Sequence, residues 1–153
     1  MDDDTTTPAA LRINFATTCA CFNLRKAARA VTSLYDSMLQ PTGLRSTQAT
    51  LLMAIASAGT ATISRLAEVL VMDRTTLARD LKPLEAQGLI RIAAGADRRT
   101  RYVHLTDAGQ VKLQAILPLW EQAQAKLIAE GLGPTRWGRL YDTLQEVVRV
   151  VQT

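Results

Sequence analysis

The sequence predicts a mainly α-helical protein that contains one small β-hairpin. Apolar residues recur every three or four positions along most of the 153-residue chain, which is the spacing of amphipathic helices. Two short alternating segments, 89–92 and 101–105, flank an arginine-rich loop and form a hairpin pattern. A chain of this length is most simply one domain with its own hydrophobic core.

The first ten residues, MDDDTTTPAA, are acidic and polar, and they predict a disordered tail over 1–10 rather than a secretory signal. Residues 11–39 then carry apolar side chains at helical spacing and predict one long amphipathic helix. No apolar run has the length needed to cross a membrane. We therefore expect a cytoplasmic protein with no membrane partner, whose single domain covers residues 11–153.

Three shorter helices are predicted in the middle of the chain. Ser46 is a favourable N-cap for a helix over 47–58, and a short helix is expected over 63–70. A three-residue turn ends in Asp73, which can cap a further helix over 74–87. The hairpin follows directly after this helix.

Two long helices are predicted after the hairpin. Thr106 is placed to cap a helix over about 107–130, and Pro134 opens the last helix. The apolar residues of the last helix are Trp137, Leu140, Tyr141, Leu144, Val147, Val148 and Val151. The first and last helices are too apolar for the surface of a lone monomer, because large exposed apolar patches usually mark an interface. We expect dimerisation helices over about 11–39 and 107–153.

The order helix, tight turn, helix and basic hairpin is that of a winged helix-turn-helix, here with long N- and C-terminal dimerisation helices. In that arrangement the second helix of the pair lies in the major groove of DNA, and the hairpin reaches beside it. Between Arg91 and Arg101 there are four arginines and one acid, Asp97. The chain has a net charge of +4, and its positive charge is concentrated in the hairpin, where the negative potential of a narrow DNA groove would attract it. These features predict a DNA-binding lobe over about 46–106.

Candidate DNA contacts lie on the second helix of the pair and in the hairpin loop. Arginine suits bidentate contact with guanine, and threonine suits phosphates or a thymine methyl group. The predicted set is Arg74, Thr75, Thr76, Arg79, Lys82, Asp97, Arg98, Arg99 and Arg101. Asp97 can orient Arg99 or an arginine at the base of the helix. The alternatives are a solvated charged face and an ordinary surface ion pair, worth less than about 1 kcal/mol.

Four segments carry a resemblance to a known family. They are DRTTLARDLKPLE at 73–85, GLI at 88–90, the wing motif DRR at 97–99 and VHLTDAG at 103–109. Together they resemble the MarR family of bacterial transcriptional regulators. The resemblance implies a homodimer that binds a palindromic operator in double-stranded DNA, as a repressor that an inducer releases.

The first helix also resembles the organic-hydroperoxide-sensing branch of this family. The match places Cys21 at the reactive position and Tyr35 at the position of a tyrosine that binds the thiolate. Arg25 replaces a second such tyrosine, and its charge would favour the thiolate. Cys19 and Cys21 would point about 200° apart on a helix and could not pair while the segment is helical. Buried structural cysteines and a soft-metal site shared with the other subunit are the alternatives.

The resemblance further implies a small-ligand pocket between the dimerisation helices and the DNA-binding lobe, which in this family often takes aromatic carboxylates. The candidate lining residues are Phe22, Arg25, Arg29, Tyr35, Leu51 and Met53. Their rings and guanidinium groups suit a phenolic acid or a thioester. Ordinary core and surface roles are the alternative for each of them.

The sequence contains no catalytic constellation. It has one histidine, and it lacks H-E-x-x-H, a phosphate-cradling glycine loop and G-x-S-x-G. That histidine, His104, falls in a predicted wing strand, which leaves little for a zinc site. We therefore expect a protein that is not an enzyme and needs no cofactor or metal. A winged helix used only for protein contacts is the alternative, but it would not need three arginines in its wing.

Overall fold

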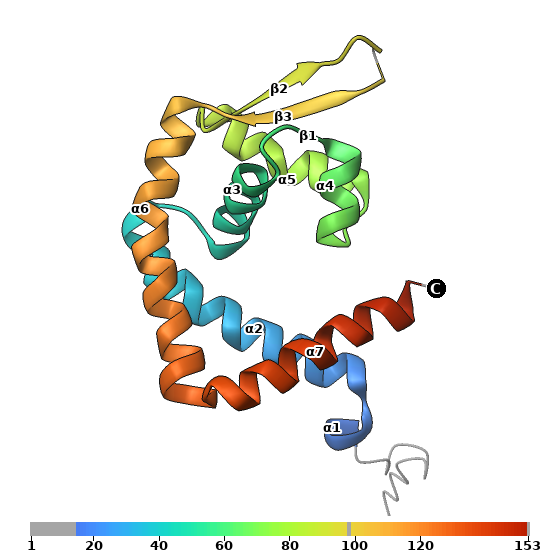
Figure 1. The fold of residues 1–153 in the computed structure, drawn as a ribbon, viewed down its shortest axis with the longest axis vertical. Coiled ribbons are helices and arrows are strands. Elements are labelled where there is room, and N and C mark those ends of the chain that lie inside the picture. The colour runs from blue at the N-terminus through green and yellow to red at the C-terminus, as the bar shows by residue number, and fades with distance from the viewer. Residues whose placement is uncertain (1–14, 98, 153) are drawn as a thin grey trace, which may run out of the picture.

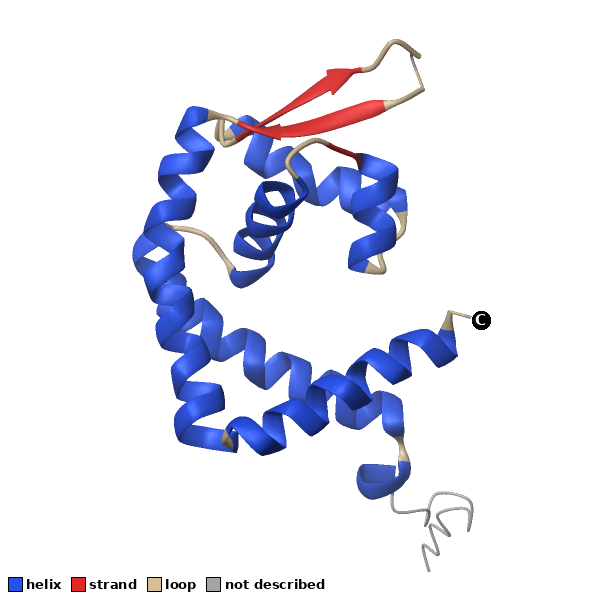
Figure 2. Cartoon of the chain, in the orientation of Figure 1, coloured by secondary structure: helices blue, strands red, loops and turns tan. Residues whose placement is uncertain are grey.

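A computed structural model describes residues 15–97 and 99–152 of the chain. Figure 1 shows a lobe of three helices and a small sheet, to which long helices are attached, and Figure 2 shows how fully helix dominates. This is the predicted fold class. The predicted tail over 1–10, the start of the predicted first helix and Arg98 lie outside the described residues.

The described elements follow one another without long connections. In chain order they are α1 (Phe15–Thr18), α2 (Ala20–Leu39), the 3-10 turn η2 (Gln40–Thr42), α3 (Ser46–Ala58), β1 (Ala61–Thr62), α4 (Ile63–Leu70), α5 (Arg74–Ala86), β2 (Ile90–Ala94), β3 (Arg101–Leu105), α6 (Asp107–Gln124), the π-helical segment η3 (Ala125–Leu132) and α7 (Pro134–Val151). Among the helices of the described part, none has the length and apolar character to cross a membrane.

The hydrophobic core lies in the lobe. The helix α5 buries one face through Leu77, Leu81 and Leu84, whose spacing of four and three residues places them on one side. The helices α2 and α6 enter the same core with Leu39 and Ile116, whereas α7 buries none of its residues. The lobe is therefore packed onto α2 and α6, and α7 lies apart from it, crossing α2 in the view of Figure 1.

The sheet has three antiparallel strands in the order β1-β3-β2. The predicted hairpin is present, with Ile90 opposite Leu105 and Ala94 opposite Arg101. The strand β1 was not predicted, because its two residues are too few to show alternation. It pairs Ala61 with Val103 on the other edge of β3 and thereby places the start of α4 beside the wing.

The prediction of one continuous first helix is wrong. The helix is interrupted at Cys19, whose ψ of 106° is extended, and α2 begins at the next residue. The Cys19 Sγ accepts a hydrogen bond from the Phe22 N–H at 3.4 Å, so the thiol caps α2. Phe15 and Phe22 pack across the interruption with ring centroids 4.8 Å apart. The apolar pattern continues through this point, which is why periodicity alone does not reveal the break.

Two further helix boundaries differ from their predictions. Ser46 is the first residue of α3 and not its cap, and its N–H donates to Asp36 Oδ1 at 2.6 Å. This hydrogen bond holds the pKa of the Asp36 carboxyl below its ordinary value, and it ties the lobe to α2. The α-helix predicted to reach residue 130 ends at Gln124 and widens into η3.

The wing is joined to α6 by a compact junction around Thr106. Its N–H donates to the Leu89 carbonyl at 3.1 Å, and its hydroxyl donates to the Gly88 carbonyl at 2.6 Å. The same hydroxyl accepts from the Gly109 N–H at 3.0 Å, which confirms Thr106 as the cap of α6. Gly109 is buried against Leu89, and a Cβ there would overlap the Leu89 carbonyl oxygen.

Candidate nucleic-acid interface

The helix α5 is held by its first turn. The Asp73 carboxylate accepts the Thr76 N–H at 2.8 Å and the Thr76 hydroxyl, so Asp73 is the cap that the sequence predicted. These two hydrogen bonds hold the pKa of Asp73 below its ordinary value, with the hydroxyl making the larger contribution. The turn before it contains Val71 in the left-handed region, at a φ of 53°, which is uncommon for a β-branched residue.

A groove of about 1060 Å³ lies between α5 and the wing. Its lining residues are Thr62, Ile63, Ser64, Arg74, Thr75, Ala78, Arg79, Lys82, Arg99, Thr100 and Arg101. Five of these side chains are basic, and none of the described residues in the lining is acidic. Clustered positive charge in a concave surface attracts a polyanion.

The groove brings together six of the nine predicted DNA contacts. They are Arg74, Thr75, Arg79, Lys82, Arg99 and Arg101. The four residues from α5 share one face of the helix because their spacing follows the helical period. Thr76 does not line the groove, because it lies about 200° around the helix from Arg74; its hydroxyl donates to Asp73. Arg98 lies outside the described residues.

Asp97 acts on the backbone of the wing tip. Its Oδ1 accepts the Arg99 N–H at 3.0 Å, and its carbonyl accepts the Thr100 N–H at 2.9 Å. The wing closes below this turn through the Gly95 N–H and the Thr100 carbonyl, at 2.8 Å. Asp97 thus orients the chain at Arg99, and in the described part of the chain it makes no ion pair with an arginine side chain.

Sequence reasoning missed three polar residues of the groove, Thr62, Ser64 and Thr100. Thr62 caps α4 by accepting the Arg65 N–H at 3.1 Å, and pairing of β1 with β3 brings this end of α4 to the wing. The signal for Thr62 is its place as a threonine directly before a helix. Its position beside the wing depended on the unpredicted strand.

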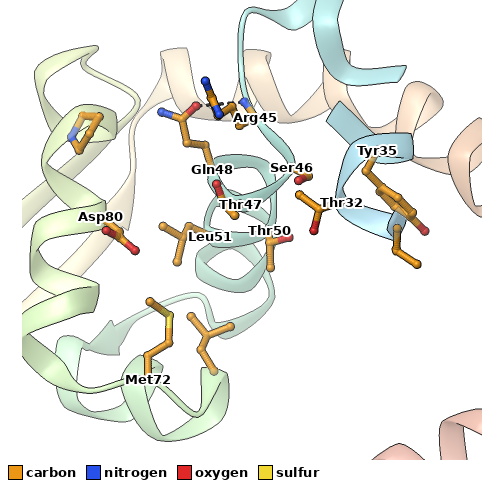
Figure 3. Close-up of a pocket in the computed structure, with 13 residues that line it drawn as sticks. Thr32, Tyr35, Arg45, Ser46, Thr47, Gln48, Thr50, Leu51, Met72 and Asp80 are labelled. Atoms are coloured by element: carbon orange, nitrogen blue, oxygen red, sulfur yellow. Dashed lines mark hydrogen bonds between the residues drawn. The ribbon is translucent and has the colours of Figure 1, made fainter. Parts of the chain in front are cut away.

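A second pocket, of about 640 Å³, lies between α2, α3, the end of α4 and α5 (Figure 3). Its lining residues are Val31, Thr32, Tyr35, Arg45, Ser46, Thr47, Gln48, Thr50, Leu51, Leu70, Met72, Asp80 and Pro83. One cation, Arg45, and one anion, Asp80, face a mixed wall of hydroxyl and apolar groups. The chemistry of the wall suits a small amphipathic molecule.

Two of the predicted pocket residues, Tyr35 and Leu51, line this pocket. Phe22, Arg25, Arg29 and Met53 do not; Phe22 packs on α1, and Arg29 borders a separate shallow depression on α2. The Tyr35 hydroxyl donates to Gln124 Oε1 of α6, and partial burial raises its pKa. Tyr35 therefore links the pocket to α6.

Both cysteines are free thiols, with Cys19 half-buried and Cys21 exposed. Tyr35 lies fourteen residues after Cys21 on α2, which corresponds to roughly 21 Å along the helix axis. Within one protomer the two side chains are therefore far apart. Arg25 lies one helical turn after Cys21.

Comparison with known proteins extends these observations. A sequence model of the MarR family matches residues 42–100. The chain is 36% identical to the Mycobacterium tuberculosis transcriptional regulator MosR in a crystal structure with DNA, over 88% of this chain and 99% of that chain, with a TM-score of 0.77. It is also 26% identical to the Bacillus subtilis HTH-type transcriptional regulator YwoH over 70% of this chain and 78% of that protein.

The fold is shared more widely. A mutant of MarR from Escherichia coli, solved with operator DNA, superimposes with a TM-score of 0.79 over 88% of this chain and 97% of that chain, at 21% identity. The family match, the extended identity to MosR and the winged helix-turn-helix agree with one another. The chain belongs to the MarR family of transcriptional regulators.

Proposed function

We propose that the protein is a cytoplasmic transcriptional regulator that binds a palindromic DNA operator as a homodimer. The groove between α5 and the wing carries this proposal, because it gathers five basic side chains without an acidic one among its described lining residues. Phosphates neutralised by such side chains release counterions, which is the main source of affinity for DNA. The relative MosR was crystallised with DNA, which supports the same role for this chain.

The two sides of the groove contact different parts of the DNA duplex. The helix α5 enters the major groove, where Arg74 and Arg79 can contact base edges through paired N–H groups. Lys82, farther along α5, and Arg101 of the wing strand are placed for phosphates. Arg99 at the wing tip reaches toward the backbone or the minor groove, where the negative potential of DNA is strong.

We further propose that the regulator is a repressor and that an inducer in the second pocket releases it. Asp80 and Pro83 of α5 line that pocket, so an occupant is in direct contact with the DNA-contacting helix. An aromatic carboxylate fits the lining, with its charge on Arg45 and its ring against Leu51 and Met72. A ligand that binds more tightly when α5 is displaced from its DNA-binding position favours the displaced state. It lowers the affinity for DNA to the extent that its own affinities for the two states differ.

Arg99→Ala should weaken binding to the operator by roughly 1–3 kcal/mol and leave the fold intact. The side chain lies at the tip of the wing and lines the groove, and it supports no described core contact. Fluorescence anisotropy with an operator duplex at fixed salt measures the change. Arg139→Ala removes the same charge from α7 and serves as the control, with affinity close to that of the wild type. An unaltered affinity in Arg99→Ala would contradict the role of the wing.

A second candidate for the signal is oxidation of the N-terminal thiols. Cys19 lies at the interruption before α2, so helical geometry does not fix it on the face opposite Cys21. Cys21 is exposed and lies in the first turn of α2. An organic hydroperoxide would transfer one oxygen to the Cys21 thiol as its O–O bond breaks, giving a sulfenic acid and the corresponding alcohol.

DNA-bound wild type exposed to an organic hydroperoxide should dissociate, and Cys21→Ser should stay bound under the same treatment. The reason is that a modified first helix would tilt the recognition helices, whose half-sites lie roughly 34–36 Å apart. A gel-shift series that also includes Cys19→Ser shows which of the two sulfurs is needed for release. Wild type that stays bound, or Cys21→Ser that is released equally, would show the cysteines to be structural. Resistance of Cys19→Ser alone would assign sensing to Cys19.

A further inference from the structure

The helix α5 forms the wall between the DNA groove and the second pocket. Arg79 and Lys82 line the groove, whereas Asp80 and Pro83 line the pocket. Adjacent residues on a helix point about 100° apart, so the helix alone does not bring Arg79 and Asp80 together. The Arg79 side chain nevertheless turns toward Asp80, and its Nε donates to Asp80 Oδ1 at 3.3 Å.

This contact leaves most of the guanidinium available. Asp80 takes the Nε–H, so the terminal nitrogens of Arg79 remain free to meet DNA. The Arg79 side chain is 72% exposed and that of Asp80 is 41% exposed, so the pair lies at the surface. A surface pair of this kind contributes little to stability. Its effect is on the direction of the Arg79 side chain.

We propose that Asp80 is a positioning residue that makes Arg79 select a base edge rather than a phosphate. This inference rests on the proposed DNA-binding function. Reading guanine requires two N–H groups held in a fixed direction, whereas a phosphate accepts an arginine from many directions. The Asp80 carboxylate restrains Arg79, so that the guanidinium does not turn to a phosphate. This restraint lowers affinity for random duplex and raises discrimination in favour of the operator.

The test uses an operator that the full-length wild-type protein selects from a random-sequence duplex pool. Affinity for this operator and for random duplex is then measured for wild type, Asp80→Asn, Arg79→Ala and the double variant. Asp80→Asn should bind random duplex more tightly, with a salt slope steeper by about one phosphate contact per protomer. Its ratio of operator to random affinity should fall by about tenfold, the scale of one base contact.

The double variant shows whether Asp80 acts through Arg79. In the Arg79→Ala background, Asp80→Asn should leave the affinity ratio unchanged, because the residue to be positioned is absent. Asp80→Glu keeps a carboxylate and should retain most of the wild-type ratio. Glu68→Gln removes the same charge and breaks the other described ion pair of the lobe, with Arg65 at 3.0 Å, outside the groove lining. It should leave the ratio at the wild-type value.

Two results would overturn the inference while leaving the proposed function intact. One is an affinity ratio in Asp80→Asn equal to that of the wild type, with circular dichroism showing a folded protein. The other is an equal loss of ratio in the presence and absence of Arg79. A wild-type protein that enriches no sequence from the pool gives a different result, since it refutes sequence-specific DNA binding and the inference with it.

Discussion

Gly109→Ala should lower the free energy of unfolding by roughly 3 kcal/mol, the upper part of the range for overpacked cores. Gly109 lies in the first turn of α6, and a Cβ there would overlap the Leu89 carbonyl oxygen and approach Leu105 Cδ2 to 2.9 Å. The Leu89 carbonyl is part of the backbone and already accepts the Thr106 N–H, so no change of side-chain rotamer can relieve the overlap. Either the start of α6 or the base of the wing must move.

Chemical denaturation followed by circular dichroism measures this loss at a fixed protomer concentration, because assembly alters apparent stability. Gln110→Ala is the matched control, since Gln110 is the next residue of the same helix and is exposed. Its unfolding free energy should stay within about 0.5 kcal/mol of the wild type. Equal stability of Gly109→Ala and the wild type would mean that the junction is looser than the structure shows.

Val147→Glu should convert the protein from a dimer to a monomer or an unfolded chain. The helix α7 carries an apolar stripe at Leu140, Leu144, Val147 and Val151, with the spacing of four, three and four that two packed helices share. None of these residues is buried in the protomer, and Val151 is 79% exposed. Such a stripe is stable in water when a second copy covers it.

Light scattering at micromolar concentration should give wild type a mass of twice 16.7 kDa. Gln145→Glu introduces the same charge on α7 but outside the stripe, and it should remain dimeric. Val147→Glu should lose the dimeric mass. A wild-type protein that is folded and monomeric at this concentration would contradict the proposed dimer.

The parts of the fold that follow local rules could be predicted from the sequence. Asp73 and Thr106 precede their helices as capping residues, and both caps are present. The wing was predictable because the alternation of 101–105 and the arginine loop are both local in sequence. Six residues of the groove could be predicted from these elements. The helical period shows which side chains of α5 share one face, and the hairpin pattern shows which side chains lie at the wing tip.

The remaining features depend on contacts between distant segments. Ser46 was expected to cap α3, but its own N–H donates to Asp36 of α2, and no local pattern connects α2 with the start of α3. The strand β1 exists because β3 offers a free edge. The break at Cys19 interrupts no apolar pattern, and cysteine is not among the preferred capping residues. The pocket residues were the least predictable, because the lining of the pocket joins four helices whose packing the sequence does not specify.

The central claim is that the groove between α5 and the wing binds DNA through its five basic side chains. The direct measurement is the affinity of the wild-type protein for random-sequence duplex as the salt concentration rises from about 50 to 200 mM. With two copies of the groove in a dimer, the logarithm of the binding constant should fall linearly with the logarithm of the salt concentration, and affinity should drop by about three to five powers of ten. Absence of duplex binding at low salt, or an affinity that salt does not change, would contradict the claim and favour a winged helix that binds only protein.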